Sequence, residues 1–395
     1  MKTIIGSKDI TVFLTGRVDS VNAPEVEGEL FDIAECNKGK RLVLDSSEME
    51  YISSAGLRVL MKLKKKYNDF ELINVTPDIY EILSTTGFTE ILTIHKKLKE
   101  ITVNEENFIG AGANGKVYRL DDERIVKVYN PISNPPEKIE REKAAARQAF
   151  VHGIPSAIPF DIVKIDGMYG MIYELINADT LGKYINSHPE EMEKYAVEMA
   201  ELLRQLHDTE FNENELPDAR LGLKNWIKIA EDSGYYRQSD LDKVYDLVDS
   251  IPHRDTFIHG DFHPGNIMLS DGEMFLIDMT DASIGHPVID LLGMFQLMKL
   301  LPLMKPAIAP RYTGMKMELS VGMWDAFLRR YLGTDDASKI SEVEKVLGIY
   351  GFIRSLGGVT FSDEVPDGVR REQAAKIIHC ILKGIEQGIT NVDFL

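Results

Sequence analysis

The sequence of 395 residues contains little cysteine and little tryptophan, with two residues of each. The cysteines, Cys36 and Cys380, are far apart and belong to no CxxC or Cys/His pattern. A disulfide framework needs several cysteines, and a zinc site of the common type needs cysteine and histidine at short spacings. The sequence therefore predicts neither.

Long apolar segments are also missing. No stretch approaches the roughly 20 apolar residues of a membrane span. The N-terminus, Met1 to Gly6, has neither the positive region nor the apolar run of a signal peptide. We therefore expect a cytoplasmic protein with no membrane partner.

A surplus of positive charge is absent as well, since 45 Lys and Arg stand against 63 Asp and Glu, for a net charge of -18. Residues 1–100 hold 14 basic and 16 acidic side chains, whereas the remainder holds 31 and 47. An acidic surface repels nucleic acids and anionic lipids and attracts cations. We expect no nucleic-acid partner, and the acidic part of the chain favours a cationic small molecule as its ligand.

The length predicts two or three domains, at about 150 residues per domain. In the first hundred residues, strands and helices alternate, which predicts a compact α/β domain. Expected strands are residues 10–15, 41–45 and 70–75, and expected helices are 22–35, 77–84 and one after Ser54. In that last helix, Leu57, Leu60 and Met61 are expected on the buried face.

The string LDSSEMEYISSAGLRVL, residues 44–60, resembles the STAS domain of bacterial anti-sigma factor antagonists, and the resemblance covers nearly all of residues 1–100. It implies a protein partner and a serine at the start of a helix that a partner kinase phosphorylates. Ser54 is the favoured candidate and Ser53 the alternative, because this chain has ISSAG where many members have DSSG. Both serines could instead serve only as helix caps.

A polar segment at residues 96–107 predicts a boundary near residue 103, with one domain at 1–102 and a second at 103–395. The string FIGAGANGKVYRL then carries a GxGxxGxV pattern, formed by Gly110, Gly112, Gly115 and Val117. Glycines there let a hairpin backbone close over phosphate groups where side chains would collide. Taken alone, the pattern also fits a glycine-rich hairpin without a ligand.

A lysine lies in the expected strand RIVKVY, where Val126 and Val128 flank Lys127. A lysine in so apolar a strand needs an anionic partner, and the phosphates of a nucleotide would supply one. Kinases usually support this lysine with a helical glutamate. Glu142 in EREKAAARQAF is the favoured candidate for that role and Glu140 the competing one.

The strongest pattern is FIHGDFHPGNIML, residues 257–269, followed by MFLIDMT, residues 274–280. Asp261 and Asn266 have the D-x-x-x-x-N spacing of a kinase catalytic loop, and Asp278 ends the next apolar strand. Asp261 is predicted to orient and deprotonate an attacking hydroxyl. Asn266 and Asp278 offer oxygen ligands of the kind that Mg²⁺ prefers.

Two histidines flank the predicted base. No third residue has a spacing that would complete a metal site with His259 and His263, so both are interpreted as residues that stabilise the loop. His263 also stands where protein kinases usually carry a lysine. This replacement favours a small molecule over a protein as the substrate.

The strings HGDFHPGN, ID and IGHPVIDL, with AELLRQLHDTEF at residues 200–211, resemble the aminoglycoside phosphotransferase and choline kinase superfamily over about residues 105–395. The resemblance implies ATP and Mg²⁺ as cofactors, an N-lobe at about 103–175 and a C-lobe at about 176–395. It also implies a hinge at YELIN that contains Glu174, a further nucleotide-binding candidate. His286 replaces the usual aspartate of IGDP, and Asp290 is interpreted as an anchor of the loop.

Taken together, these features predict an α/β STAS-like domain followed by a two-lobed α+β domain of the protein-kinase type. The predicted function is transfer of the ATP γ-phosphate to a hydroxyl of a small molecule, with the first domain regulatory. Residues 221–249, with Trp226, Tyr235 and Tyr236, are the expected wall of the acceptor site, although such aromatic residues also fit a core. The alternative function is a signalling switch that phosphorylates the STAS-like domain or a partner, or senses nucleotide.

Overall fold

The computed structural model describes residues 1–67, 70–112, 114–132, 134–212, 215–359 and 365–394. The chain divides into two compact units, Met1–Thr102 and Val103–Leu395, each with its own hydrophobic core. In the described ranges, no helix has both the length and the apolar character needed to cross a membrane.

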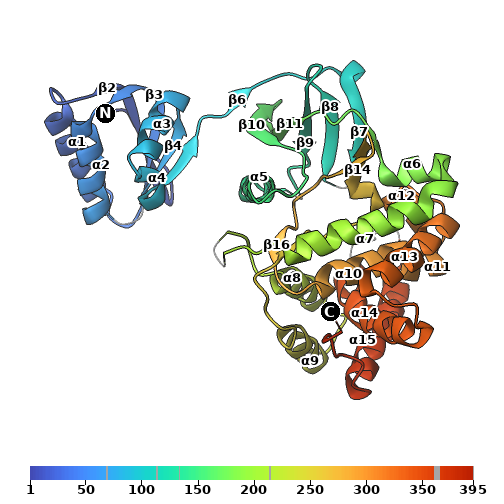
Figure 1. Ribbon diagram of the computed structural model, residues 1–395. Helices are drawn as coiled ribbons and strands as arrows, with labels where there is room; N and C mark the ends of the chain where they lie inside the picture. Colours follow the sequence, from blue (N-terminus) through green and yellow to red (C-terminus); the bar gives the residue numbers. More distant parts are fainter. Residues whose placement is uncertain (68–69, 113, 133, 213–214, 360–364, 395) are drawn as a thin grey trace. The chain divides into compact units, whose positions relative to one another are not determined.

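The first unit is a five-stranded sheet with helices, in the strand order β1-β2-β3-β4-β5 (Figure 1). β1 runs antiparallel to β2, and the remaining neighbours run parallel. Parallel neighbours need crossover connections, which helices supply here. The elements are β1 (Thr3–Ile5), β2 (Asp9–Val18), α1 (Ala23–Cys36), β3 (Arg41–Ile52), α2 (Ser54–Lys66), β4 (Phe70–Val75), α3 (Pro77–Thr85), α4 (Phe88–Ile91), β5 (Thr93–Lys96) and β6 (Lys99–Glu100).

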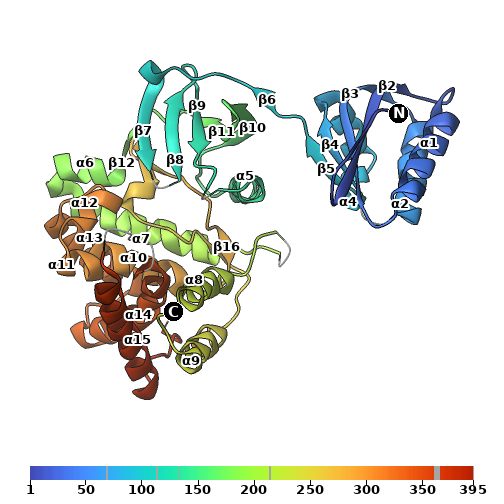
Figure 2. The same ribbon diagram turned by 180° about the vertical axis from the view of Figure 1, so that it is seen from behind.

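The core of this unit follows the alternation along β2, where Ile10, Val12 and Leu14 are buried. Helix α2 packs beside α1 and covers the core with a face slightly different from the expected one (Figure 2). Val59, Leu60 and Leu63 are buried, whereas the predicted Leu57 and Met61 are only half-buried. The buried residues Gly56, Val59, Leu60 and Leu63 follow one another at helical spacing, and their stripe is shifted by one position from the predicted face.

The second unit begins with an antiparallel sheet in which five strands follow the order β10-β11-β9-β8-β7. Helix α5 starts with a proline, which suits the first turn of a helix, and packs against β10 and β11 (Figure 1). The elements of this lobe are η1 (Glu105–Asn107), β7 (Phe108–Gly112), β8 (Gly115–Arg119), β9 (Arg124–Tyr129), α5 (Pro136–Val151), β10 (Pro159–Ile165) and β11 (Met168–Glu174).

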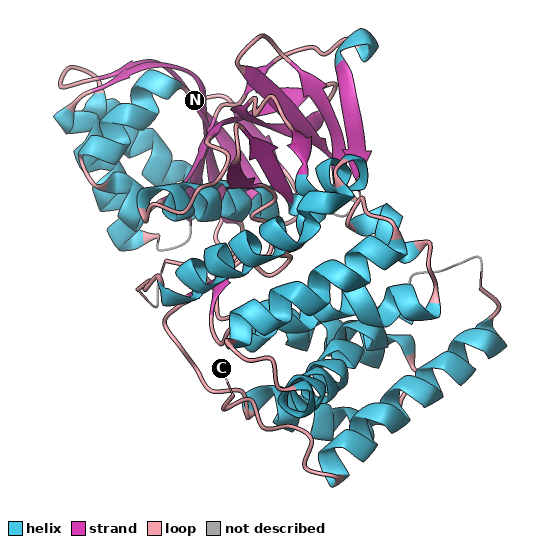
Figure 3. Cartoon of the chain, turned by 45° about the vertical axis from the view of Figure 1, so that its right-hand side comes forward, coloured by secondary structure: helices cyan, strands magenta, loops and turns pink. Residues whose placement is uncertain are grey.

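Helices dominate the remainder of the second unit (Figure 3). Short strands pair as β12-β14-β15 and β13-β16 and carry the loops of the site. The elements are β12 (Asp179–Thr180), α6 (Leu181–Ser187), η2 (Pro189–Glu191), α7 (Met192–Asp208), α8 (Arg220–Ser233), α9 (Gln238–Asp249), β13 (Phe257–Ile258), η3 (Pro264–Asn266), β14 (Ile267–Ser270), β15 (Glu273–Leu276), β16 (Ser283–Ile284), α10 (Val288–Phe295), η4 (Gln296–Leu300), α11 (Leu301–Met304), α12 (Ile308–Tyr312), α13 (Met317–Leu332), α14 (Ala337–Gly358) and α15 (Asp367–Glu386).

Helix α7 packs against α13 in this helical lobe. Its apolar stripe of Ala196, Met199, Ala200, Leu203 and Leu206 is fully buried. The two lobes, one an antiparallel sheet with a helix and the other mainly helical, confirm the predicted fold class of the second unit.

Candidate active site

The glycine-rich segment forms the hairpin between β7 and β8, in which Gly112 faces Gly115. Gly115 has a φ of +156°, and a Cβ there would lie 2.0 Å from the carbonyl oxygen of Val128, so only glycine fits. At Gly110 and Gly112, no described atom lies within 4 Å of an added Cβ. Internal packing therefore does not explain these two glycines, which leaves room for a ligand. Val117 pairs with Lys127 across β8 and β9.

Lys127 joins β9 to two carboxylates. Its Nζ lies 2.8 Å from Oε1 of Glu142 and 3.2 Å from Oδ1 of Asp278. Glu142 is buried, whereas Glu140 is exposed, which favours Glu142 of the two predicted candidates. Burial opposes the charge of Lys127, but Asp278 and Glu142 outweigh it and raise the pKa of the ammonium group. The lysine is therefore charged and held in place.

Two residues that the sequence did not single out hold Glu142. Tyr173, in the predicted hinge strand β11, donates its hydroxyl to Oε1 of Glu142 at 2.7 Å. Thr280 donates to Oε2 at 2.8 Å and also contacts Oδ1 of Asp278. Burial, followed by the negative charge of Glu142, raises the pKa of Tyr173 well above its usual range. Glu142 thus has a fixed orientation toward Lys127.

Glu174 lies at the end of β11, two strands from the hairpin. Its carboxylate accepts a hydrogen bond from the amide of Ile158 at 2.8 Å, and its own amide donates to the Ile158 carbonyl at 3.1 Å. The side chain is thus engaged within the hinge. Its predicted part in nucleotide binding stays a prediction.

Asp261 lies in the loop between β13 and η3. Its Oδ2 accepts a hydrogen bond from Nδ2 of Asn266 at 3.0 Å and lies 3.5 Å from Nε2 of His263. The Asn266 amide nitrogen also donates to the Asp261 carbonyl at 2.9 Å, so its oxygen is turned away from Asp261. Gly260 precedes the aspartate with a φ of +83°, and a Cβ there would lie 2.4 Å from the Asp281 carbonyl oxygen. The loop conformation thus requires glycine at this position.

The charge of Asp261 is stabilised by its neighbours. Burial would raise its pKa, but His263, then Arg354 and His259, together hold the pKa of this carboxyl well below its usual range. His263 also accepts the amide hydrogen of Gly265 at 3.0 Å, and His259 accepts that of Asp261 at 3.3 Å. Both histidines contact the loop backbone, in agreement with their predicted role.

Asp290, in the first turn of α10, binds the backbone of this loop. Its two carboxylate oxygens accept the amide hydrogens of His259 at 3.0 Å and Gly260 at 2.7 Å. Its Oδ2 also lies 3.1 Å from Nε2 of His207 on α7, whose Nδ1 lies 2.7 Å from the hydroxyl of Tyr331 on α13. Asp290 is thus the structural anchor that the sequence indicated, and the sequence did not reveal His207 and Tyr331 behind it.

Asp278 follows β15 with a φ of +64°, which is uncommon for a residue other than glycine. Its Oδ1 faces Nζ of Lys127. Its Oδ2 accepts a hydrogen bond from Nδ2 of the Asn114 side chain, in the hairpin, at 3.3 Å. Burial opposes its ionisation, but Lys127 and Thr280 lower the pKa of the carboxyl. Among the described residues, no group of three or more His, Cys, Asp or Glu could hold a metal. Asp278 and Asn266 fit an ion that takes its other ligands from phosphates, as Mg²⁺ does.

The predicted acceptor wall packs mainly against the last helices. The hydroxyl of Tyr236 donates to the Leu356 carbonyl at 2.9 Å, and that of Tyr235 donates to Asp367 at 2.8 Å. A Cβ on Gly357 would lie 2.8 Å from the ring of Trp226. These three aromatic residues therefore join α8 and its following loop to α14 and α15.

In the first unit, Ser53 is the N-cap of α2, and its hydroxyl accepts the amide hydrogen of Ala55 at 3.1 Å. Ser54 is the first residue of the helix and is exposed. The two candidate serines therefore differ, because one is engaged as a cap and the other is accessible.

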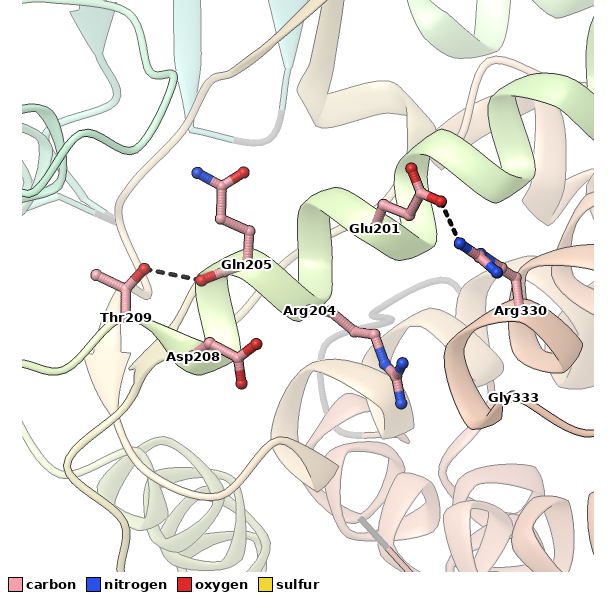
Figure 4. A pocket seen from close by; sticks show the side chains of 7 residues that line it. All are labelled: Glu201, Arg204, Gln205, Asp208, Thr209, Arg330 and Gly333. Carbon is pink, nitrogen blue, oxygen red and sulfur yellow. Dashed lines mark hydrogen bonds and ion pairs between the residues drawn. The ribbon is translucent and has the colours of Figure 1, made fainter.

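A hollow of about 530 Å³ opens between α7 and α13 (Figure 4). It is lined by Glu201, Arg204, Gln205, Asp208, Thr209, Arg330 and Gly333. Glu201 forms an ion pair with Arg330, and Thr209 donates to the Gln205 carbonyl at 2.8 Å. None of the predicted site residues lines this hollow, so the candidate chemistry lies elsewhere in the unit.

Comparison with known proteins gives two family matches. The model of the phosphotransferase enzyme family matches residues 105–310, more than half of the chain, and the model of the STAS domain matches residues 2–101. The first unit is similar to BtrV of Bordetella bronchiseptica, whose name assigns it a provisional role as an anti-sigma factor antagonist. The two are 37% identical over 86 residues, which cover 20% of this chain and 72% of BtrV.

Several solved structures are also similar. The GDP and kanamycin complex of APH(2″)-IIia has 13% identity, covers 70% of this chain and 92% of its own, and has a TM-score of 0.44. A choline/ethanolamine kinase family protein from Mesorhizobium loti has 14% identity, coverages of 73% and 89%, and a TM-score of 0.44. The aminoglycoside phosphotransferase APH(3″)-Id from Streptomyces rimosus has 18% identity, coverages of 63% and 92%, and a TM-score of 0.42.

Proposed function

Because the chain belongs to the phosphotransferase enzyme family and begins with a STAS domain, we propose that its second unit transfers the γ-phosphate of ATP to a hydroxyl group of a small molecule. The observation that carries this proposal is the convergence of Lys127, Asp278, Asn266 and Asp261. Lys127 contacts Asp278 at 3.2 Å, and Asn266 contacts Asp261 at 3.0 Å. These are the groups that phosphoryl transfer needs for the phosphates, the metal and the attacking hydroxyl.

The nucleotide would lie under the hairpin that contains Gly110 and Gly112. Lys127, held by Glu142, would bind its inner phosphates as a fixed positive charge. Asn266 and Asp278 would hold Mg²⁺, and this ion, when bound, neutralises the charge that develops on the transferred group. Nucleotide entry would require the hydrogen bond between Asn114 and Asp278 to break, because it closes the hairpin toward the metal ligands.

Asp261 would accept a hydrogen bond from the acceptor hydroxyl and take its proton as the hydroxyl oxygen bonds to the γ-phosphorus. The bond from the γ-phosphorus to the β-phosphate oxygen would break in the same transfer, and ADP would leave. Because His263, Arg354 and His259 hold the pKa of this carboxyl well below its usual range, it is ready to orient the hydroxyl as a carboxylate. A strongly basic group is not required, because phosphoryl transfer proceeds through a loose transition state in which little proton transfer has to come first.

The test is the Asp261→Asn variant of the full chain, assayed for ATP consumption against a panel of hydroxylated metabolites and aminoglycosides. We expect turnover to fall by roughly a hundredfold or more, because a general base is lost, while binding of ATP with Mg²⁺ persists. Asp271→Asn is the matched control, since it makes the same change at an exposed turn between β14 and β15. Unchanged turnover in Asp261→Asn would remove this residue from its proposed role.

The proposal assigns a regulatory role to the first unit, with a protein partner at the serine loop. Ser54 is exposed at the N-terminus of α2, where a phosphate would be favoured by the helix amides. A chain that starts at Thr102 should still bind ATP. Intact-mass measurement after incubation with ATP and Mg²⁺ tests whether the second unit adds the phosphate, and a phosphate that persists in Ser53→Ala/Ser54→Ala would exclude this serine loop.

A further inference from the structure

The two carboxylate oxygens of Asp261 face different neighbours. Oδ2 lies beside Asn266 and His263, on the side of the metal ligands. Oδ1 lies 3.7 Å from Nη2 of Arg354. Because Oδ2 already accepts a hydrogen bond from Asn266, Oδ1 is the oxygen better placed to receive an acceptor hydroxyl. Arg354 therefore lies where the acceptor would bind.

Arg354 reaches this position from α14, far from every sequence motif of the site. A Cβ on Gly293 of α10 would lie 2.5 Å from Nη1 of Arg354, so the guanidinium occupies space that a side chain at Gly293 would take. The side chain of Arg354 is 20% exposed. Among the described residues, its guanidinium makes no hydrogen bond, because the 3.7 Å between Nη2 and Oδ1 of Asp261 exceeds the length of one. Its N–H donors therefore keep hydrogen-bonding capacity for a ligand.

The other charged groups around Arg354 are acidic. Asp281 lies on the loop after Asp278, and its backbone carbonyl approaches Gly260. Burial raises the pKa of the Asp281 carboxyl, the negative charge of Asp261 raises it further, and the positive charge of Arg354 lowers it. Arg354 thus forms an ion pair with Asp261 and acts electrostatically on Asp281, on which Lys138 acts more weakly. A neutral or cationic acceptor would offer the guanidinium no anion beyond Asp261.

We propose that Arg354 selects an acceptor that carries an anionic group, a carboxylate or a phosphate, next to the hydroxyl that is phosphorylated. This inference rests on the proposed phosphotransferase function and names its substrate class. A guanidinium binds both anions with two parallel hydrogen bonds, and this contact would place the hydroxyl beside Oδ1 of Asp261. Arg354 thus favours an anionic acceptor, whereas the overall acidic charge of the second unit favours a cation.

The experiment compares matched acceptors with the full chain and Mg-ATP: glycerate and glycerol 3-phosphate as anionic compounds, glycerol as the neutral one and choline as the cationic one. We expect transfer to an anionic compound, and the better of the two distinguishes a carboxylate from a phosphate. In Arg354→Gln, kcat/KM for that acceptor should fall by about 10-fold to 100-fold, mainly through KM. The KM for ATP should stay within about twofold, because ATP makes no contact with Arg354 in this arrangement.

Two further variants separate binding from a structural role. Arg354→Lys should recover part of the loss, since it keeps the charge without the paired donors. Gly293→Ala leaves Arg354 in the chain but displaces its guanidinium, so it should also raise KM for the anionic acceptor. Arg329→Gln removes a half-exposed arginine from α13 and should change neither value.

The inference is overturned if no anionic compound of the panel is phosphorylated, or if Arg354→Gln lowers transfer to the neutral and the anionic acceptor by the same factor. The second result would mean that Arg354 only positions Asp261. Failure of the proposed function itself would look different, because the full chain would then not bind Mg-ATP, as measured by calorimetry.

Discussion

The two units differ in where they keep their polar side chains. Among the described residues of the first unit, Asp45 is the one buried ionisable group, and its oxygens accept from Ser47 and Asn74. The second unit buries several, among them Glu142, His207, His259, His263, His286 and Asp290. Burying such groups is costly unless each has a partner. The comparison shows a first unit with little buried charge and a second that buries the polar groups supporting its half-buried candidate site.

Asp290→Asn should change the relative stability of the two units most. An amide nitrogen would replace a carboxylate oxygen that accepts the amide hydrogen of His259 or Gly260. We expect the free energy of unfolding of the second unit to fall by about 3 kcal/mol, as when one partner of a buried polar network is removed. Urea unfolding, followed by a probe for each unit, measures it, because units with separate cores can unfold separately.

The control for this prediction is Asp246→Asn, which makes the same change on the exposed face of α9. The contrast between the units would be wrong if the transition of the first unit moved as far as that of the second in Asp290→Asn. It would also be wrong if Asp246→Asn lowered the free energy of unfolding of the second unit as much as Asp290→Asn does.

A smaller effect is expected from His286, which is buried beside α10 and accepts the amide hydrogen of Val288 at 3.2 Å. Burial, followed by the charges of Arg254 and His207, lowers its pKa to about 4. The unfolded chain, with a histidine pKa of about 6.5, therefore takes up the proton first. The stability contributed by the neutral ring is complete above about pH 6.5 and is lost as the pH falls toward 4.

His286→Asn should remove this dependence and flatten the pH profile of the second unit between these values, a difference of about 2 kcal/mol at the acidic end. Urea unfolding at several pH values would measure it. His95→Asn is the control, because it removes an exposed histidine from the first unit. A profile of the second unit that stays as steep in His286→Asn as in the wild type would contradict the assignment.

The smallest effect concerns the surface of the first unit. Ser53→Ala removes the cap of α2 and should lower the free energy of unfolding of the first unit by about 1 kcal/mol, whereas Ser54→Ala should change it little. Thermal or urea unfolding of that unit checks both. Equal losses in the two variants would show that the structural difference between Ser53 and Ser54 does not determine their roles.

Much of the fold and part of the candidate site could be predicted from the sequence. The motifs of phosphoryl transfer place their functional residues at short, fixed distances along the chain. Asp261, Asn266 and Asp278 lie within one stretch of chain, and the glycine hairpin and Lys127 lie on neighbouring strands. The structure brings these predicted residues together, and Glu142, rather than Glu140, contacts Lys127. Their roles stay predictions.

Residues that act through tertiary packing left no such signal. Tyr173 and Thr280 support Glu142, and Arg354 reaches Asp261 from a helix whose sequence carries no motif. The buried face of α2 was misjudged by one position because Leu57, Leu60 and Met61 form a plausible stripe until the sheet is in place. Only the packing of α14 on α10 brings Arg354 over Gly293.

The anchoring of the catalytic loop by Asp290 has a consequence for incompletely folded molecules. Asp290 contacts a histidine that lies 83 positions away in the sequence, and that histidine contacts a tyrosine 124 positions away. Contacts of such long range form late, because closing large loops is entropically unfavourable. A partly unfolded chain would therefore keep the antiparallel sheet of the second unit after the loop that contains Asp261 has lost its anchor. The candidate site would be incomplete in such molecules.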